Sequence, residues 1–226
     1  MEPRLSSYFI VRCKHARTER PICAKLTVMN VRHRVTPLLR HRKVDTPLGT
    51  LVLVASSRGL VRIAFEGDEQ VDELVRSGVI GVSRSGDDEC DEGSFLDSAE
   101  EQLEEYFRGE RESFALVLNL SPTLPGPQGA PNPFVSPNAK FHSKVQIALL
   151  SIRFGETASY ADVARLLGSV GAARAVGTAC ATNPLPIVLP CHRVVRADGK
   201  LGGYTSGIDK KRKLLEHESV QLSDPA

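Results

Sequence analysis

The stretch that organises this chain reads Asn183-Pro-Leu-Pro-Ile-Val-Leu-Pro-Cys-His-Arg-Val-Val-Arg-Ala-Asp-Gly-Lys-Leu-Gly-Gly-Tyr204. It holds one cysteine, Cys191, between a proline and a histidine at the end of a short apolar run. The prolines exclude a helix and stiffen the approach to the cysteine, because proline lacks a backbone donor and restricts the residue before it. We expect residues 187–189 to form a buried, strand-like segment. A cysteine on such an element is either a packed core residue or a positioned nucleophile.

The composition is that of a globular chain with one or two domains, since 41% of its 226 residues are hydrophobic and 25% are charged. We find no apolar run of about 18 residues and no signal-peptide pattern at the N-terminus, so no membrane partner is expected. The five cysteines are odd in number and scattered, which favours a reducing compartment over a disulfide framework. We therefore expect a cytoplasmic protein, or a nuclear one in a eukaryote.

The small net charge of +2 hides a strong asymmetry along the chain. Residues 1–44 carry 11 basic and 2 acidic side chains, residues 45–140 carry 7 and 18, and residues 141–226 carry 11 and 7. The acidic middle argues against a polyanion partner there, whereas both flanks could face one. Residues 1–42 have no helical or strand period, so we expect a basic, disordered extension. Its cysteines and histidines match no zinc-finger spacing.

Residues 43–120 are expected to form a small α/β domain, because apolar and β-branched runs alternate there with turn signals and helical periods. The expected elements are a turn at 46–49, strands at 50–55 and 60–65, a helix over 67–76, a loop over 77–94, a helix over 97–107 and a strand over 114–120.

Six prolines within residues 121–140 predict an interdomain linker. Residues 141–220 then read as a mostly helical domain, followed by a tail at 221–226. Ser159 and Asp162 form a capping box that should open its second helix. The expected helices cover 141–152, 160–167, 172–182 and 207–218, the last with the basic residues 210–213 facing outward. A helix–turn–helix followed by a small-residue helix is typical of nucleic-acid contact, although an ordinary packed helical pair would read the same way.

The residue types around Cys191 suit thiol chemistry. The cysteine could be a nucleophile if deprotonated, His192 and His217 are candidate bases, and Glu218 could orient one of them. Adjacent residues of a strand point to opposite faces, so a bridging water is a better link from Cys191 to His192 than a direct hydrogen bond. From these residues alone, a packed cysteine remains the alternative.

The motif Pro190-Cys191-His192-Arg193-Val194, preceded by Asn183-Pro184-x-Pro186-Ile187, resembles the active-site signature of the O6-alkylguanine-DNA alkyltransferases (methylated-DNA–protein-cysteine methyltransferases). The resemblance runs without gaps from Gly155 to Glu218, and residues 46–49 and 102–109 resemble the N-terminal domain of the family. It implies an α+β fold, with a small ribonuclease-H-like α/β domain followed by a mostly helical, winged helix-turn-helix-like domain.

The resemblance also implies a function, since this family flips an alkylated guanine out of duplex DNA and transfers the alkyl group irreversibly to a cysteine. The expected substrate is O6-alkylguanine in double-stranded DNA, with O4-alkylthymine as a candidate second substrate. The expected protein is a monomer that acts once and needs no cofactor. We expect no metal either, because Ser56 stands where zinc-binding members carry a cysteine. For the chemistry, the resemblance implies Cys191 as acceptor, His192 as a base that acts through a water, Glu218 as the group that orients His192, Tyr204 as hydrogen-bond partner of the guanine, and Asn183 as brace of the turn. The implied pocket residues are Pro186, Val194 and Thr205. For DNA binding, the resemblance implies that Arg174 fills the vacated place in the stack, that Tyr160 contacts the target phosphate, and that Ala173, Gly177 and Thr205 make further contacts.

Two other classes of protein compete with this reading. A non-catalytic sensor of alkylated bases would share the fold, but in that group the acceptor cysteine is replaced, whereas this chain keeps Cys191. A cysteine hydrolase would instead use Cys191, His217 and Glu218 as a triad-like set.

Overall fold

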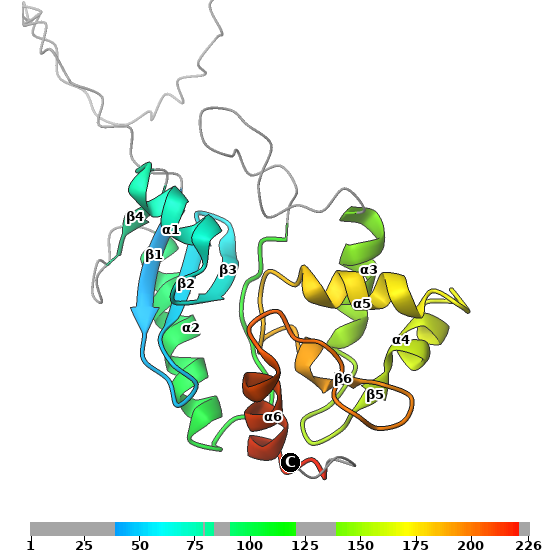
Figure 1. The fold of residues 1–226 in the computed structure, drawn as a ribbon. Coiled ribbons are helices and arrows are strands. Elements are labelled where there is room, and N and C mark those ends of the chain that lie inside the picture. The colour runs from blue at the N-terminus through cyan, green and yellow to red at the C-terminus, as the bar shows by residue number, and fades with distance from the viewer. Residues whose placement is uncertain (1–38, 79, 84–90, 121–138, 222–226) are drawn as a thin grey trace, which may run out of the picture. The chain divides into compact units, whose positions relative to one another are not determined.

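The structure, a computed structural model, describes residues 39–78, 80–83, 91–120 and 139–221 (Figure 1). Most of the expected basic extension, most of the linker and most of the C-terminal tail lie outside these residues. The α+β fold class is confirmed: a mixed sheet with two helices is followed by a mostly helical region.

The first domain is a four-stranded sheet with a helix on each face. Strands β1 (Leu39–Val44), β2 (Leu51–Ser56) and β3 (Gly59–Phe65) form an antiparallel meander. The short β4 (Ile80–Val82) pairs parallel with β1, which gives the order β3-β2-β1-β4. Helices α1 (Glu69–Arg76) and α2 (Asp91–Phe107) complete the domain.

Strand β2 is buried along its whole length because both of its faces are covered. Leu51, Leu53 and Ala55 lie in one core cluster with residues of α2, while Val52 and Val54 lie in a second cluster with residues of α1. This follows from the two-residue period of a strand, which sends alternate side chains to opposite faces. The continuous apolar run that predicted the strand therefore reflects burial on two sides.

Several predicted boundaries in this domain were wrong. Strand β1 begins at Leu39, inside the expected extension, and buries Arg42 against carboxylates of Asp97 and Glu100 on α2. The expected loop at 77–94 contains β4, and α2 starts six residues before the expected helix.

The strand expected at 114–120 is instead an extended segment with one isolated bridge to β3. Leu60 donates its backbone N–H to Val117 O at 2.8 Å, and Asn119 N donates to Leu60 O at 2.8 Å. Apolar residues do alternate along residues 114–120, but only residues 117–119 form backbone hydrogen bonds with β3.

The second domain consists of helices around one apolar core. Its elements are α3 (Ala139–Leu149), β5 (Ala158–Ser159), α4 (Tyr160–Leu166), α5 (Ala173–Ala181), the 3-10 turn η2 (Cys191–Arg193), β6 (Val194–Val195) and α6 (Ile208–His217). The expected capping box opens α4: Asp162 N donates to the Ser159 hydroxyl at 3.1 Å, and Ser159 N donates to the Asp162 carboxylate at 3.0 Å. Strands β5 and β6 pair in parallel.

The loop that carries the cysteine completes the core of the first domain. Leu185, residues 187–189 and Leu214 belong to the same buried cluster as the inner face of the sheet and α2. A backbone hydrogen bond from Ile63 N to Pro184 O, 2.9 Å long, joins this loop to β3. The loop is therefore fixed by packing against the first domain as well as by its own domain.

Candidate active site

The segment before Cys191 is a tight turn, so the expected strand at 187–189 was wrong. Leu189 N donates to Leu185 O at 2.8 Å, and Ile187 adopts a positive φ of 75°. That region is unfavourable for a β-branched residue, because its Cβ crowds the backbone. A short buried apolar run does not distinguish a strand from a packed turn by its period. The turn persists because its side chains are buried in the core.

Asn183 ties this turn to the thiol. Its Nδ2 donates to Leu189 O at 2.7 Å and to Cys191 Sγ at 3.0 Å, and its Oδ1 accepts from Leu185 N at 3.0 Å. The amide thus satisfies backbone groups of the turn and contacts the sulfur at the same time. These three hydrogen bonds connect the turn to the thiol.

Cys191 is nearly enclosed, with 4% of its surface exposed, at the start of η2. Burial raises the pKa of its thiol, while the hydrogen bond from Asn183 and the charge of Lys211 act in the opposite direction. A neutral thiol is therefore the resting form, and thiolate chemistry here requires a group that takes the proton.

His192 has such an acceptor nitrogen. Its Nε2 lies 2.9 Å from Glu218 Oε1, and both side chains are fully buried. An ionised carboxylate only accepts, so Nε2 carries the proton and Nδ1 carries the lone pair. Nδ1 is buried and has no hydrogen-bond partner among the residues that the structure describes. Burial lowers the pKa of His192, against the raising effect of Glu218, and keeps the imidazole neutral.

Arg193 pairs with the same carboxylate in a bidentate manner. Its Nε donates to Glu218 Oε2 at 2.8 Å and its Nη2 donates to Oε1 at 2.9 Å, while Nη1 donates to Ile152 O at 2.6 Å. Burial alone would raise the pKa of Glu218, but the hydrogen bonds from His192 and Arg193 lower it to about 2. Glu218 is therefore an anion that orients His192.

Lys211 is a charged residue buried close enough to Cys191 to affect the pKa of its thiol. We expected residues 210–213 to face outward, but Lys211 is fully buried and its Nζ donates to Val194 O at 2.5 Å. Burial lowers the pKa of this ammonium, and the neighbouring Cys191 and Cys180 act to raise it. The helical spacing could have predicted this burial, because Lys211 lies on the same helical face as Leu214, Leu215 and Glu218.

Tyr204 carries another buried polar group near the cysteine. Its hydroxyl is buried and finds no partner within the described part of the chain. Burial raises the pKa of this phenol far above its ordinary value, and the neighbouring Cys191 raises it further, so it remains a donor. Thr205, one residue on, is exposed and donates to Ala181 O at 2.6 Å, which anchors the loop to the end of α5.

Helix α5 carries three of the residues that are expected to contact DNA, and none of the three is fully buried. Arg174 is exposed, and Ala173 and Gly177 are half-buried. A Cβ at Gly177 would lie 3.8 Å from the Tyr160 ring, so the small residue allows helix α4 to approach. Tyr160 also packs against Gly202, and burial raises its pKa to about 12. Of the expected pocket residues, Pro186 and Val194 are buried, whereas Thr205 is exposed.

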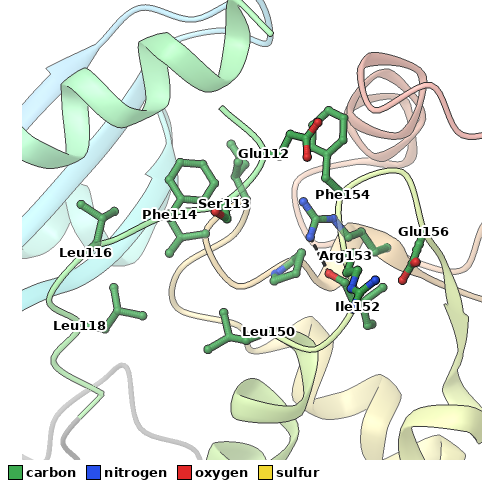
Figure 2. A pocket seen from close by; sticks show the side chains of 14 residues that line it. Glu112, Ser113, Phe114, Leu116, Leu118, Leu150, Ile152, Arg153, Phe154 and Glu156 are labelled. Carbon is green, nitrogen blue, oxygen red and sulfur yellow. Dashed lines mark hydrogen bonds between the residues drawn. The ribbon is translucent and has the colours of Figure 1, made fainter. Parts of the chain in front are cut away.

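A cavity of about 540 Å³ lies behind the cysteine turn. Figure 2 shows Phe114, Leu116 and Leu118 on one wall and Leu150 and Ile152 on another. The cavity touches Pro190 and Arg193, but Cys191 is not part of its lining. It therefore shares residues with the site without opening onto the sulfur.

His217 does not join the cysteine. Its Nε2 donates to Tyr106 O at 2.8 Å, and its ring packs against Tyr106, Phe107 and Phe154. Its interactions in the described residues are thus with an aromatic cluster. This arrangement gives no support to a hydrolase triad built from Cys191, His217 and Glu218.

No group of three or more His, Cys, Asp or Glu side chains in the described residues is arranged to hold a metal ion. Ser56 is engaged in the backbone and side-chain network of its hairpin: its hydroxyl donates to Gly59 O at 3.2 Å and accepts from Asn119 Nδ2 at 2.9 Å. Within the described ranges, no helix is both long and apolar enough to cross a membrane.

The fold and site together define a two-domain protein with a buried cysteine beside a histidine–carboxylate pair and an exposed, small-residue helix. Comparison with known families matches residues 39–120 to the ribonuclease-like domain of 6-O-methylguanine DNA methyltransferase and residues 140–220 to its DNA-binding domain. The chain belongs to this family of cysteine alkyltransferases.

Individual relatives agree with this assignment. A methylated-DNA–protein-cysteine methyltransferase of Mycobacterium leprae is 35% identical over 185 residues, which cover 82% of this chain and 95% of the relative. The crystal structure of Mycobacterium tuberculosis O6-methylguanine methyltransferase matches with a TM-score of 0.62 at 34% identity, over 82% of this chain and 96% of that one. The Mycobacterium tuberculosis protein in complex with DNA matches with a TM-score of 0.60 at 34% identity, over 79% and 92% of the two chains.

Proposed function

We propose that this protein repairs DNA by moving the alkyl group of O6-alkylguanine in duplex DNA onto Cys191, once per molecule. The observation that carries the proposal is the pairing of a buried thiol, held by Asn183, with a His192–Glu218 pair whose free imidazole nitrogen can accept a proton. The match to a relative solved with DNA supports the choice of partner.

The chemical step follows from these groups. The thiol proton of Cys191 passes to His192 Nδ1 through a bridging water, and the buried Glu218 anion stabilises the resulting imidazolium. The thiolate attacks the alkyl carbon, the bond from that carbon to O6 breaks, and the electron pair leaves with the guanine. Tyr204, still protonated, donates a hydrogen bond to the departing base. The thioether product has no easy hydrolytic exit, so the protein is consumed.

Base flipping is supported by burial. With 4% of its surface exposed, Cys191 cannot reach a base that remains in the stack. In the proposed complex, α5 lies in the minor groove, where its small residues avoid clashes, and Arg174 fills the place that the base leaves. Tyr160 contacts the phosphate of the target nucleotide. Pro186, Val194 and Thr205 form the base pocket, and Ala173 and Gly177 allow close approach of the helix. The same pocket is the proposed site for O4-alkylthymine.

The test is an equimolar titration with duplex carrying O6-methylguanine. The proposal predicts one repaired base per protein molecule and no further turnover. Cys191→Ala should abolish repair but retain binding to the duplex, because no DNA contact is assigned to the sulfur. Arg174→Ala should slow repair of the duplex more than reaction with the free base. Continued turnover would instead support a hydrolase, and tight binding without repair would support a sensor.

A further inference from the structure

Tyr106 reaches across from the ribonuclease-like domain to the carboxylate of the site. It lies near the end of α2, and its hydroxyl donates to Glu218 Oε1 at 2.7 Å. Both residues are buried, although 112 positions separate them in sequence. This hydrogen bond is a polar contact from the first domain to a group that touches His192.

The Tyr106 ring is fixed by its surroundings. Ring centroids of Phe107, Phe114, Phe154 and His217 lie 4.9 to 6.1 Å from its own, in edge or tilted arrangements. The hydrogen bond from His217 Nε2 to Tyr106 O holds the backbone as well. These contacts hold the ring in a position from which its hydroxyl reaches Glu218 Oε1.

The Tyr106 phenol remains protonated, and therefore a donor, at neutral pH and well above it. Burial raises the pKa of Tyr106 well above its ordinary value, and the adjacent Glu218 anion raises it further. A neutral donor on a carboxylate draws negative charge away from the oxygen that it contacts.

Glu218 Oε1 is a shared acceptor. It receives hydrogen bonds from Tyr106, from His192 Nε2 and from Arg193 Nη2, while Oε2 receives Arg193 Nε. Any donor that withdraws charge from Oε1 weakens the hold of the carboxylate on the His192 proton. The position and the basicity of His192 are thus coupled to Tyr106 through one oxygen atom.

We propose that Tyr106 is a positioning residue for the cysteine transfer, whose hydroxyl orients Glu218 and limits how strongly that carboxylate stabilises protonated His192. The inference rests on the proposed function. It gives the ribonuclease-like domain, which contributes none of the reacting groups assigned above, a direct part in the chemistry.

The proposal predicts a shift in the pH dependence of transfer. The charged and titratable groups that influence His192 are Glu218, Arg193 and Lys211, with Cys191 next in the chain. Removing the Tyr106 hydroxyl leaves these groups in place but concentrates charge on Glu218 Oε1. The pKa of His192 then rises, so a larger fraction is already protonated at a given pH and cannot accept the thiol proton. The acid limb of the rate profile should move to higher pH.

The experiment compares single-turnover repair of an O6-methylguanine duplex by the full-length protein and by Tyr106→Phe between pH 5 and 9. We expect a loss of about tenfold at neutral pH, as for one charge-assisted hydrogen bond, and an acid limb displaced upward by at least half a pH unit. Phe114→Leu is the matched control, because it removes a ring contact to Tyr106 but no hydrogen bond. Its rate should stay within about twofold of wild type, with an unshifted profile.

Each outcome has a distinct meaning. If wild type repairs the duplex and Tyr106→Phe matches it in rate and profile, the positioning role is refuted while the proposed function stands. A uniform loss at all pH values, shared by Phe114→Leu, would assign Tyr106 to packing alone and would also overturn the proposal. Absence of repair by wild type would refute the proposed function itself.

Discussion

Replacing Glu218 by glutamine should cost about 3 kcal/mol of folding free energy. Native Glu218 is 1% exposed and accepts from Tyr106, His192 and Arg193. A fall in its pKa from 4.5 to about 2 corresponds to about 3 kcal/mol of folding free energy, at about 1.4 kcal/mol for each pH unit. Breaking a buried ion pair by neutralising one partner costs a similar amount, about 3 to 5 kcal/mol.

The pH dependence of this contribution has a defined sign. Because the pKa of Glu218 is lower in the folded protein, the stabilisation is complete above about pH 4.5 and disappears as the pH falls through about 2. Wild type should therefore lose stability over this window, and Glu218→Gln should lack that part of the loss.

Urea denaturation at pH 7 and at steps down to pH 2.5 measures both effects. Glu216→Gln is the matched control, since this neighbouring carboxylate on α6 is exposed. We expect it to change the free energy of unfolding by less than about 0.5 kcal/mol. A loss below about 1 kcal/mol for Glu218→Gln at pH 7, or an unchanged acid dependence, would contradict this electrostatic contribution of Glu218.

Two further substitutions test the surroundings of the cysteine. Lys211→Met should raise the pKa of the buried Cys191 thiol and slow its alkylation by iodoacetamide at pH 7 by roughly tenfold. Lys213→Met, on the exposed side of the helix, should leave the alkylation rate unchanged. Equal rates for the two variants would contradict the electrostatic effect of Lys211 on the thiol. Gly202→Ala would place a Cβ 2.3 Å from the Tyr160 hydroxyl, while at Gly203 a Cβ meets nothing within 4 Å. Thermal denaturation should show a loss of about 1 to 3 kcal/mol for Gly202→Ala only, and equal stability of the two variants would refute the close packing.

The sequence predicted those elements whose signal is local. The β-branched run of β2, the turn with Gly49 and the capping box at Ser159 all carry their own chemistry, and the structure confirms each of them. The three residues of β4 were missed because so short a strand shows no period, and its pairing with β1 is a tertiary choice.

Only part of the site could be predicted from the sequence. The placement of Glu218 against His192 came from the family resemblance, and the structure brings the two together. The bond from Tyr106 to Glu218 could not be predicted, because it depends on how two domains far apart in sequence pack. Lys211 was misassigned because a charged residue was taken as exposed, although its helical face also carries the buried Leu214 and Leu215.

Peptide mapping after one equivalent of duplex containing O6-methylguanine tests whether Cys191 is the alkyl acceptor. The protein has a second buried cysteine, Cys180, close enough to Cys191 to affect its charge state, which makes it a built-in control. We predict one added methyl group on the peptide containing Cys191, none on that containing Cys180, and none anywhere in Cys191→Ser. Methylation of Cys180, or an unmodified protein bound tightly to the duplex, would contradict this prediction.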